Sequence, residues 1–298
     1  MFYKQKDQFR RWWFGRQTRC VLKSPPIRLD EFGPALLTLL QHKDVQMYLA
    51  AIKSFARQLR PNEVHVVDDG SLTNEDHILL GRHIPDVVIH ALRTCREDGL
   101  PVGGCWERLS AVARLSETRY VIQLDADTLT LGNIPEVAEA VRSKRSFTIG
   151  TWDGQTLELA KERARAAQAH LGSGRPHVQL LAEANFDRLQ NQEDLRYVRG
   201  CAGFAGFAPG PGKLKLMKTL SVQFSSLIGD RWQEWGSEQV MSNLVVANQP
   251  DAIVLPHPEY ADCEKMESST TRFIHFIGTC RFRGGVYAHL ANKLSRES

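Results

Sequence analysis

Apolar residues in the first half of the chain follow two alternating patterns. Short uninterrupted apolar runs bounded by polar residues are typical of buried strands. Such runs occur at residues 34–40, 64–67, 86–91 and 120–124. Between them, apolar residues recur every three or four positions, which predicts amphipathic helices. These stretches are residues 44–59, a shorter one around 78–80, and 106–115. Strands that alternate with helices indicate βαβ units and a mostly parallel sheet flanked by helices.

The pattern changes after about residue 150. Polar, alanine-rich or amphipathic stretches predict further helices over residues 155–171, 213–228 and 238–246. Short apolar runs predict strands at residues 253–255 and 272–277, and residues 200–207 form a run of small residues. We therefore expect one α/β domain over residues 31–298, preceded by an extension over residues 1–30.

Composition narrows the class of protein. The chain has 298 residues, of which 42% are hydrophobic and 24% charged, so it can bury a sizeable core without a disulfide scaffold. Its net charge of +4 is mild, and no nucleic-acid-binding motif accompanies it. We therefore expect no nucleic-acid partner.

The six cysteines are scattered, and no two have the C-x-x-C spacing of zinc ligands. No secretory signal pattern occurs, and no run of about 18 apolar residues is long enough to cross a bilayer. These features predict a cytoplasmic protein with reduced thiols.

Residues 1–20 interleave basic residues with Phe9, Trp12, Trp13 and Phe14. Such a mixture suits peripheral contact with a membrane interface. It suits equally an arm that packs on the domain or on a partner subunit.

Asp125 and Asp127 follow the apolar run at residues 120–124. Side chains two positions apart in an extended segment point to the same side, and ligands bind beyond the carboxyl ends of parallel strands. The two carboxylates can therefore hold one divalent cation that bridges the phosphates of a nucleotide diphosphate. The alternative is a polar turn that closes the strand.

Asp68 and Asp69 end the apolar run at residues 64–67 and precede Gly70 and Ser71. Carboxylates at this position can accept hydrogen bonds from a ribose or a base. The alternative is a turn that leads into a helix, which also favours Asp, Gly and Ser.

These motifs resemble those of known enzymes. Val66–Ser71 followed by Leu124–Asp127 resembles the nucleotide-binding half of GT-A fold glycosyltransferases, which have a Rossmann-like fold. Ala202–Phe204, Glu238–Asn243 and His275–Arg281 resemble segments of the family 8 retaining glycosyltransferases, and all five matches keep the order of that family.

The chain also departs from the family 8 pattern. Glu238 replaces an Asp, Arg281 replaces a Lys, and Phe282 and Arg283 stand in place of Pro-Trp. The Asp-Asp-Gly-Ser form is more typical of the family 2 inverting enzymes. Retaining and inverting stereochemistry both stay open.

The resemblance implies a transferase that moves a sugar from a nucleotide diphosphate donor, a UDP-sugar by analogy, to a glycan, a lipid-linked acceptor or another hydroxyl. Residues 31–150 would hold the donor and the metal, and residues 151–298 the acceptor. His275 would be the third metal ligand, and an imidazole favours Mn²⁺ over Mg²⁺. Without that role it is an ordinary strand histidine. Arg281 would hold the diphosphate with its planar fork.

The remaining candidates are assigned by residue type and position. Glu238, with Gln239 beside it, would be a general base in an inverting reaction or lie near the reacting carbon in a retaining one. Its alternative role is a first-turn helix residue. Arg108 would reach the hydroxyls of the donor sugar or face solvent. Trp232 and Trp235 would stack on an acceptor ring or belong to the core.

Three other classes of protein compete with this interpretation. A sugar nucleotidyltransferase would need a glycine-rich loop after its first strand, and Gln41–Asp44 has no glycine. A glycoside hydrolase would use two carboxylates without a metal. A non-catalytic nucleotide-sugar or carbohydrate-binding protein would not need the metal ligands.

Overall fold

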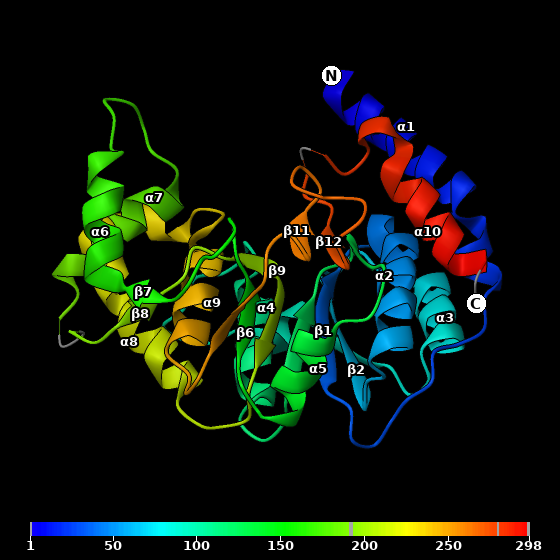
Figure 1. Cartoon of the computed structure of the whole chain (residues 1–298), viewed down its shortest axis with the longest axis horizontal. Coiled ribbons are helices and arrows are strands. Elements are labelled where there is room, and N and C mark those ends of the chain that lie inside the picture. Colours follow the sequence, from blue (N-terminus) through cyan, green and yellow to red (C-terminus); the bar gives the residue numbers. More distant parts are fainter. Residues whose placement is uncertain (1, 191–192, 279, 297–298) are drawn as a thin grey trace. The chain divides into compact units, whose positions relative to one another are not determined.

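The computed structural model describes residues 2–190, 193–278 and 280–296, and its side chains from residue 5 onward (Figure 1). It has a mixed α/β fold with a large, mostly parallel sheet flanked by helices, which confirms the predicted fold class. The chain forms two compact units that are interleaved along the sequence. Unit 1 contains Met1–Ala91, Leu124–Ala138 and Pro258–Ser298, and unit 2 contains Leu92–Gln123 and Glu139–His257.

Three parallel strands organise unit 1. They are β1 (Ala35–Leu40), β2 (Glu63–Asp68) and β3 (Val88–Ala91). Leu40 pairs with Asp68, and Asp68 pairs with Ala91, so the three strands end at one level. The connecting helices are α2 (Val45–Gln58) and α3 (Asn74–His83). Thr73 caps α3 through a capping box with Asp76.

A second, three-stranded sheet of unit 1 has the order β11-β12-β5. Its strands are β11 (Tyr260–Asp262), β12 (Phe273–His275) and β5 (Thr128–Thr130). β5 packs against α2, where the Thr130 amide donates to Ser54 Oγ over 3.1 Å. This small sheet joins segments far apart in the sequence and so brings the predicted ligands together.

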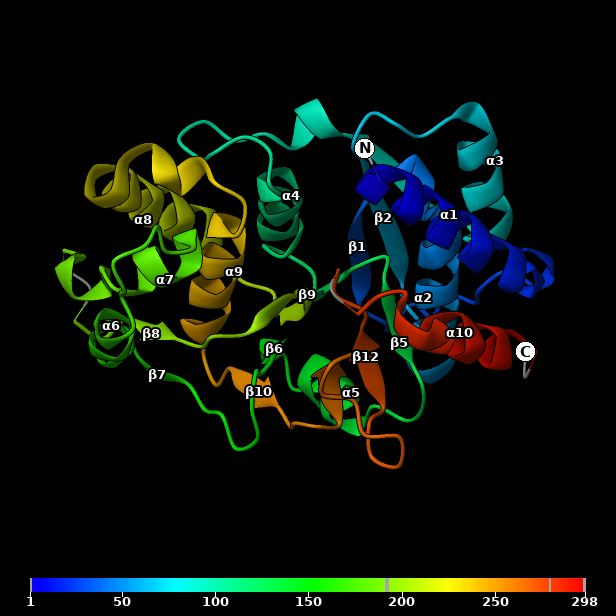
Figure 2. The same cartoon turned by 90° about the horizontal axis from the view of Figure 1, so that it is seen from above.

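The predicted extension folds as α1 (Phe2–Gln17) and a 3₁₀ turn, η1 (Arg19–Lys23), and Met1 lies outside the described residues. α1 lies beside α10 (Val286–Arg296) in both views (Figures 1 and 2). Phe14 is buried, with its ring 4.6 Å from that of Tyr287. The extension therefore packs on its own unit, one of the alternatives left open by the sequence.

Unit 2 contains a second group of strands and most of the remaining helices. Its strands are β6 (Phe147–Ile149), β9 (Cys201–Phe207), β10 (Ile253–Leu255) and all but the last residue of β4 (Val121–Leu124), with a separate pair, β7 (Glu158–Leu159) and β8 (Arg196–Tyr197). β10 is parallel to β6, and β6 is antiparallel to β9. Its helices are α4 (Trp106–Leu115), α6 (Ala160–Ala169), α7 (Val178–Glu183), α8 (Lys213–Ile228) and α9 (Ser237–Ala247), and α5 (Pro135–Arg142) crosses the boundary between the units.

All of the run of small residues except Gly200 forms strand β9, for which the sequence analysis predicted no element. Gly206 pairs with Phe147 of β6. A Cβ at Gly206 would lie only 2.3 Å from the Phe147 ring, so the close approach of the two strands requires glycine.

The helix predicted over residues 155–171 begins too early. Residues 158–159 form β7 instead, and the helix starts at Ala160. Gln155 turns its side chain back to accept from the Thr151 amide at 2.6 Å and to donate to the Arg199 carbonyl at 3.2 Å. These bonds hold the segment in a turn, and an alanine-rich pattern gives no sign of them.

No helix within the described part of the chain is long and apolar enough to cross a membrane.

Candidate functional site

Asp125, Asp127 and His275 form a compact cluster in unit 1. One ligand atom from each lies within 4.8 Å of the other two. His275 Nε2 lies 3.2 Å from Asp127 Oδ1 and 3.6 Å from Asp125 Oδ2. Asp127 and His275 are buried, whereas Asp125 is partly exposed. The cluster therefore has a protected side and an accessible side.

Strand pairing explains why residues 148 positions apart meet. β12 runs antiparallel to β5, with His275 opposite Thr128. The pairing continues past the strands, because the Phe276 amide donates to the Asp127 carbonyl over 2.8 Å. The backbone pairing thus positions both His275 and Asp127 without the help of a bound ligand.

Two carboxylates and one imidazole are a donor set that suits a divalent transition metal such as Mn²⁺. The spacing of the three atoms is compatible with one shared ion. The residues present therefore fit the metal that the sequence motifs imply.

Arg281 adds a cation to the cluster by donating from Nη2 to Asp127 Oδ2. Burial would raise the pKa of Asp127, but the neighbouring His275 and Arg281 outweigh it and lower that pKa to about 2. Asp127 is thus held as a carboxylate, the form that a metal ion requires.

Arg281 belongs to a longer row of alternating charges. Asp44, at the start of α2, feels the positive charge of Arg281 and ion-pairs with Arg11 of α1. Arg11 also donates to Asp7 over 2.7 Å. The sequence analysis assigned no role to Arg11 or Asp44, because residues 33 positions apart give no local spacing signal.

A disulfide joins Cys263, just after β11, to Cys280, just before Arg281. The expectation of reduced thiols, one basis of the cytoplasmic prediction, is therefore wrong for this pair. The Cys263 amide donates to the His275 carbonyl over 3.0 Å. The bond thus ties the segment that carries Arg281 to the strand beside His275. Thr279, which belongs to the matched motif, lies outside the described residues.

Replacing both Cys263 and Cys280 with serine is expected to lower the free energy of unfolding by about 3 kcal/mol. This is the stabilisation expected from a disulfide that closes a loop as short as the one between these two residues. Urea titrations of the wild type with and without a reductant should show a difference of the same size. Cys201→Ser is the matched control, since Cys201 forms no disulfide. Equal stability of the oxidised and reduced proteins would contradict the prediction.

Asp68 and Asp69 form a turn at the end of β2. Asp68 Oδ1 accepts from the Gly70 amide at 2.8 Å, and Asp69 Oδ1 accepts from the Ser71 amide at 3.0 Å. Gly70 has a φ of 96°, a conformation that favours glycine. The turn role considered in the sequence analysis is therefore real, and the second oxygen of Asp68, Oδ2, lies 3.9 Å from His77 Nε2.

In unit 2, Glu238 of α9 and Arg108 of α4 form a buried ion pair. The Arg108 Nη2 to Glu238 Oε1 distance is 3.2 Å, and both side chains are 5% exposed. Nearby, Trp106 Nε1 donates to Ser237 Oγ over 2.9 Å and ties the starts of the two helices together. Arg108 therefore does not face solvent, and the Glu238 carboxylate is held in one orientation.

The other candidates of unit 2 differ in exposure. Trp232 is fully buried and stacks on Phe224 at a ring distance of 4.3 Å, so it belongs to the core. Trp235 is 74% exposed, so it does not belong to the core. Gln239 is half-buried and donates to Gln179 over 3.4 Å.

No protein-family model matches the chain, and no curated protein sequence matches it. Several solved structures are similar to it. Mouse xyloside xylosyltransferase 1 has 12% identity and a TM-score of 0.47, over 83% of this chain and 98% of that one. The galactosyltransferase LgtC has 11% identity and a TM-score of 0.47, over 87% and 95%. Core-mannan synthase A from Aspergillus fumigatus, in a Mn/GDP form, has 10% identity and a TM-score of 0.41, over 87% and 84%. The first two are named as glycosyltransferases.

Proposed function

We propose that the chain is a metal-dependent glycosyltransferase that moves a sugar from a uridine diphosphate donor to a hydroxyl of a glycan or lipid-linked acceptor. The observation that carries this proposal is the Asp125, Asp127 and His275 cluster with Arg281 beside it. Carboxylates and an imidazole suit a divalent cation, and a guanidinium suits a phosphate. A metal ion next to a phosphate-binding arginine is the combination that a departing nucleoside diphosphate needs.

Each residue of unit 1 then has a separate task. Asp125, Asp127 and His275 hold the cation, with Mn²⁺ preferred over Mg²⁺, and the cation supplies charge neutralisation for the leaving diphosphate. Arg281 binds the phosphates with its planar fork. Asp68 and Asp69 accept hydrogen bonds from the ribose or the base. These tasks belong to the donor half, residues 31–150, together with the segment of β12 and the residues after it that carry His275 and Arg281.

In the acceptor half, residues 151–298, we assign the chemistry to Glu238 and Gln239. Glu238 takes the proton of the acceptor hydroxyl if the reaction inverts, and the two residues lie near the reacting carbon if it retains. Arg108 orients Glu238 through their buried ion pair. Trp235 offers an exposed aromatic face to an acceptor ring.

A thermal-shift panel tests the proposal. Uridine, guanosine and cytidine diphosphates and their sugars are each combined with Mn²⁺, Mg²⁺ or a chelator. A ligand at a hundredfold its Kd should stabilise the fold by about 2.7 kcal/mol. We expect a shift with the uridine compounds and Mn²⁺ that the chelator removes and that Asp127→Asn lacks. A shift that persists in the chelator would point to nucleotide binding without this cluster, and no shift at all would reject the proposed donor.

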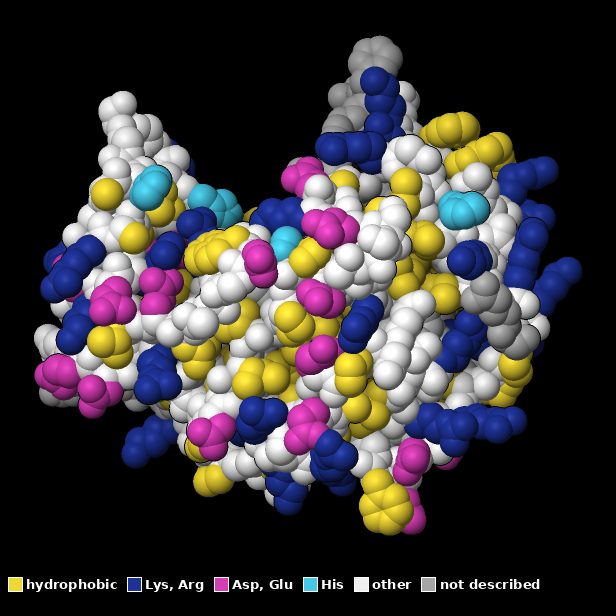
Figure 3. All heavy atoms as spheres, in the orientation of Figure 1, with side chains coloured by type: hydrophobic (Ala, Val, Ile, Leu, Met, Phe, Trp, Pro, Cys, Tyr) yellow, Lys and Arg dark blue, Asp and Glu magenta, His cyan; other side chains and the backbone are white. Residues whose placement is uncertain are grey.

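We also propose that α1 makes a peripheral contact with a membrane. Phe9, Trp12 and Trp13 are 62%, 56% and 48% exposed, and their rings lie next to one another. Figure 3 shows basic and hydrophobic side chains close together over this region, a mixture typical of interfacial helices. Partition of the full chain into anionic vesicles, compared with a Trp12→Ala/Trp13→Ala variant, tests it. Equal partition of the two proteins would reject the contact.

A further inference from the structure

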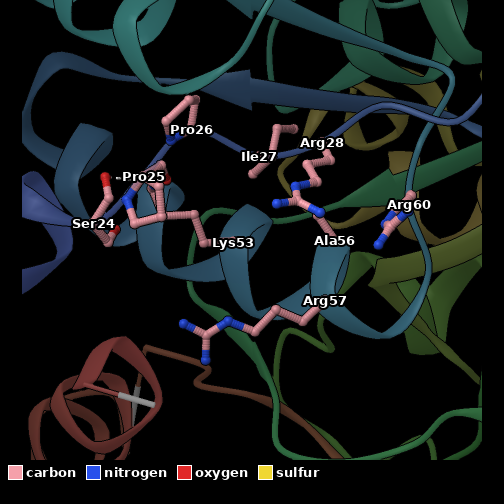
Figure 4. A pocket seen from close by; sticks show the side chains of 9 residues that line it. All are labelled: Ser24, Pro25, Pro26, Ile27, Arg28, Lys53, Ala56, Arg57 and Arg60. Carbon is pink, nitrogen blue, oxygen red and sulfur yellow. Dashed lines mark hydrogen bonds between the residues drawn. The ribbon is translucent and has the colours of Figure 1, made fainter. Parts of the chain in front are cut away.

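A pocket of about 330 Å³ opens beside the carboxyl-terminal end of α2 (Figure 4). Its wall comes from two segments, the extended chain at residues 24–28 and the last turns of α2 with Arg60 beyond them. In Figure 4, the Arg28 and Arg57 side chains lie on either side of Lys53 and Ala56. The volume is in the range of pockets that bind small molecules.

All four charged residues of this pocket are basic. They are Arg28, Lys53, Arg57 and Arg60. Within the described part of the chain, the side chains of Arg28 and Arg60 make no ion pair or hydrogen bond. Arg57 donates to the Leu294 carbonyl, and Lys53 donates to the carbonyls of Ser24 and Pro25. No carboxylate lines the pocket to balance the four charges.

The usual preference for basic residues in the last turn of a helix does not account for all four charges of the pocket. A basic residue such as Arg57 is common in the last turn of a helix, where it faces the carbonyl end. Arg28, however, comes from a different segment, and Lys53 is buried one turn earlier. Burial, followed by repulsion from Arg57, lowers the pKa of Lys53 to about 8. A bound anion would reduce this repulsion.

The pocket is separate from the metal-ligand cluster. Asp44, which feels the charges of Arg281 and Asp127, stands at the start of α2, whereas Arg57 stands in its last turn. At a rise of 1.5 Å per residue the two ends of this helix are about 20 Å apart. A donor diphosphate held by Arg281 therefore does not reach the four basic residues of the pocket.

We propose that this pocket is a second binding site, for the phosphate ester of a small organic molecule. The guanidinium groups of Arg28 and Arg60 bind the phosphoryl oxygens, because a planar fork matches phosphate geometry. Pro25, Pro26, Ile27 and Ala56 provide apolar surface for the carbon skeleton of the ester. The two prolines also restrict the backbone of this wall, so it is ordered before the ligand arrives.

The test is isothermal titration of the full chain, in chelator and low salt, with inorganic phosphate, glycerol 3-phosphate and glucose 1-phosphate. Glycerol, which lacks the phosphate, is the ligand control. The Arg28→Gln/Arg60→Gln variant should fold normally, because both side chains are exposed. It should bind the esters about tenfold or more weakly for each arginine replaced. Arg82→Gln/Lys6→Gln is the matched control, since both residues are exposed in unit 1 but outside the pocket.

A second arm separates a soluble ester from a lipid headgroup. Vesicles of neutral lipid with and without phosphatidic acid are offered to the wild type, the pocket variant and a Trp12→Ala/Trp13→Ala variant. Binding of soluble esters that the pocket variant loses supports the proposal. Binding of phosphatidic acid alone, lost in the pocket variant, supports the phosphate chemistry and assigns it to a lipid. Absence of saturable binding, or binding that the pocket variant retains, would overturn it. Because no nucleotide or metal is present, failure here is distinct from failure of the proposed transferase.

Discussion

Asp127→Asn is expected to reduce sugar transfer by at least about a hundredfold. Replacing residues that merely support metal ligands costs about 10–100-fold in metal affinity or activity, so the loss of a ligand itself should reach or exceed that range. Asparagine keeps the shape of the side chain but removes the charge that His275 and Arg281 both face. The measurement is transfer from the donor identified by thermal shift, titrated with Mn²⁺.

The matched control for this substitution is Asp262→Asn. Asp262 pairs with His275 across β11 and β12 but lies outside the group of three ligands. Its variant should keep the wild-type Mn²⁺ dependence. Wild-type turnover by Asp127→Asn, at any concentration of metal, would remove Asp127 from the proposed site.

Acid unfolding gives the Asp127→Asn variant a second readout that is independent of activity. The pKa of Asp127 is depressed from 3.8 to about 2 in the folded chain. A depressed carboxyl pKa stabilises the fold above the unfolded pKa, and this stabilisation is lost as the pH falls through the folded one. In chelator, the stability difference between wild type and variant should therefore be largest above about pH 4 and shrink toward pH 2.

The elements that the sequence predicted best are those with a strong apolar period or a sharp boundary. The helix over residues 106–115 and the strand over 253–255 have the predicted ends. β9 was not predicted because Gly203 and Gly206 interrupt the apolar alternation of the strand. The first helical turns expected at residues 155–159 were lost to side-chain bonds that propensity does not register.

The candidate site was predictable only in part, for a geometric reason. Asp125 and Asp127 are neighbours in sequence, so spacing alone identified them. His275 was chosen by resemblance, and the antiparallel pairing of β12 with β5 explains why it meets Asp127. The Arg11–Asp44 pair and the Cys263–Cys280 bond depend on tertiary packing, which no local pattern encodes. Residue type was enough to identify the candidate metal ligands, whereas the residues that support them are recognised only in the folded structure.

Arg108→Ala and Glu238→Ala are each expected to lower the free energy of unfolding by about 3–5 kcal/mol. Either change removes one partner of a buried ion pair, and losing one partner of such a pair is strongly destabilising. The double variant should lose less than the sum, because it contains neither charge. Urea titration of all four proteins measures this coupling. The exposed Arg175–Glu234 pair supplies the control, and Arg175→Ala should behave like the wild type.

Glu238→Gln separates the structural role of this carboxylate from its proposed chemical one. Glutamine preserves the volume and can still accept a hydrogen bond from Arg108, so it should destabilise the fold less than alanine does. If Glu238 takes the acceptor proton, turnover should fall by about 10²–10⁴-fold while donor affinity stays unchanged. If activity instead declines only in proportion to the folded fraction, Glu238 serves to neutralise Arg108, and the base must be sought elsewhere. The ratio of the kcat loss to the stability loss thus decides between the two roles.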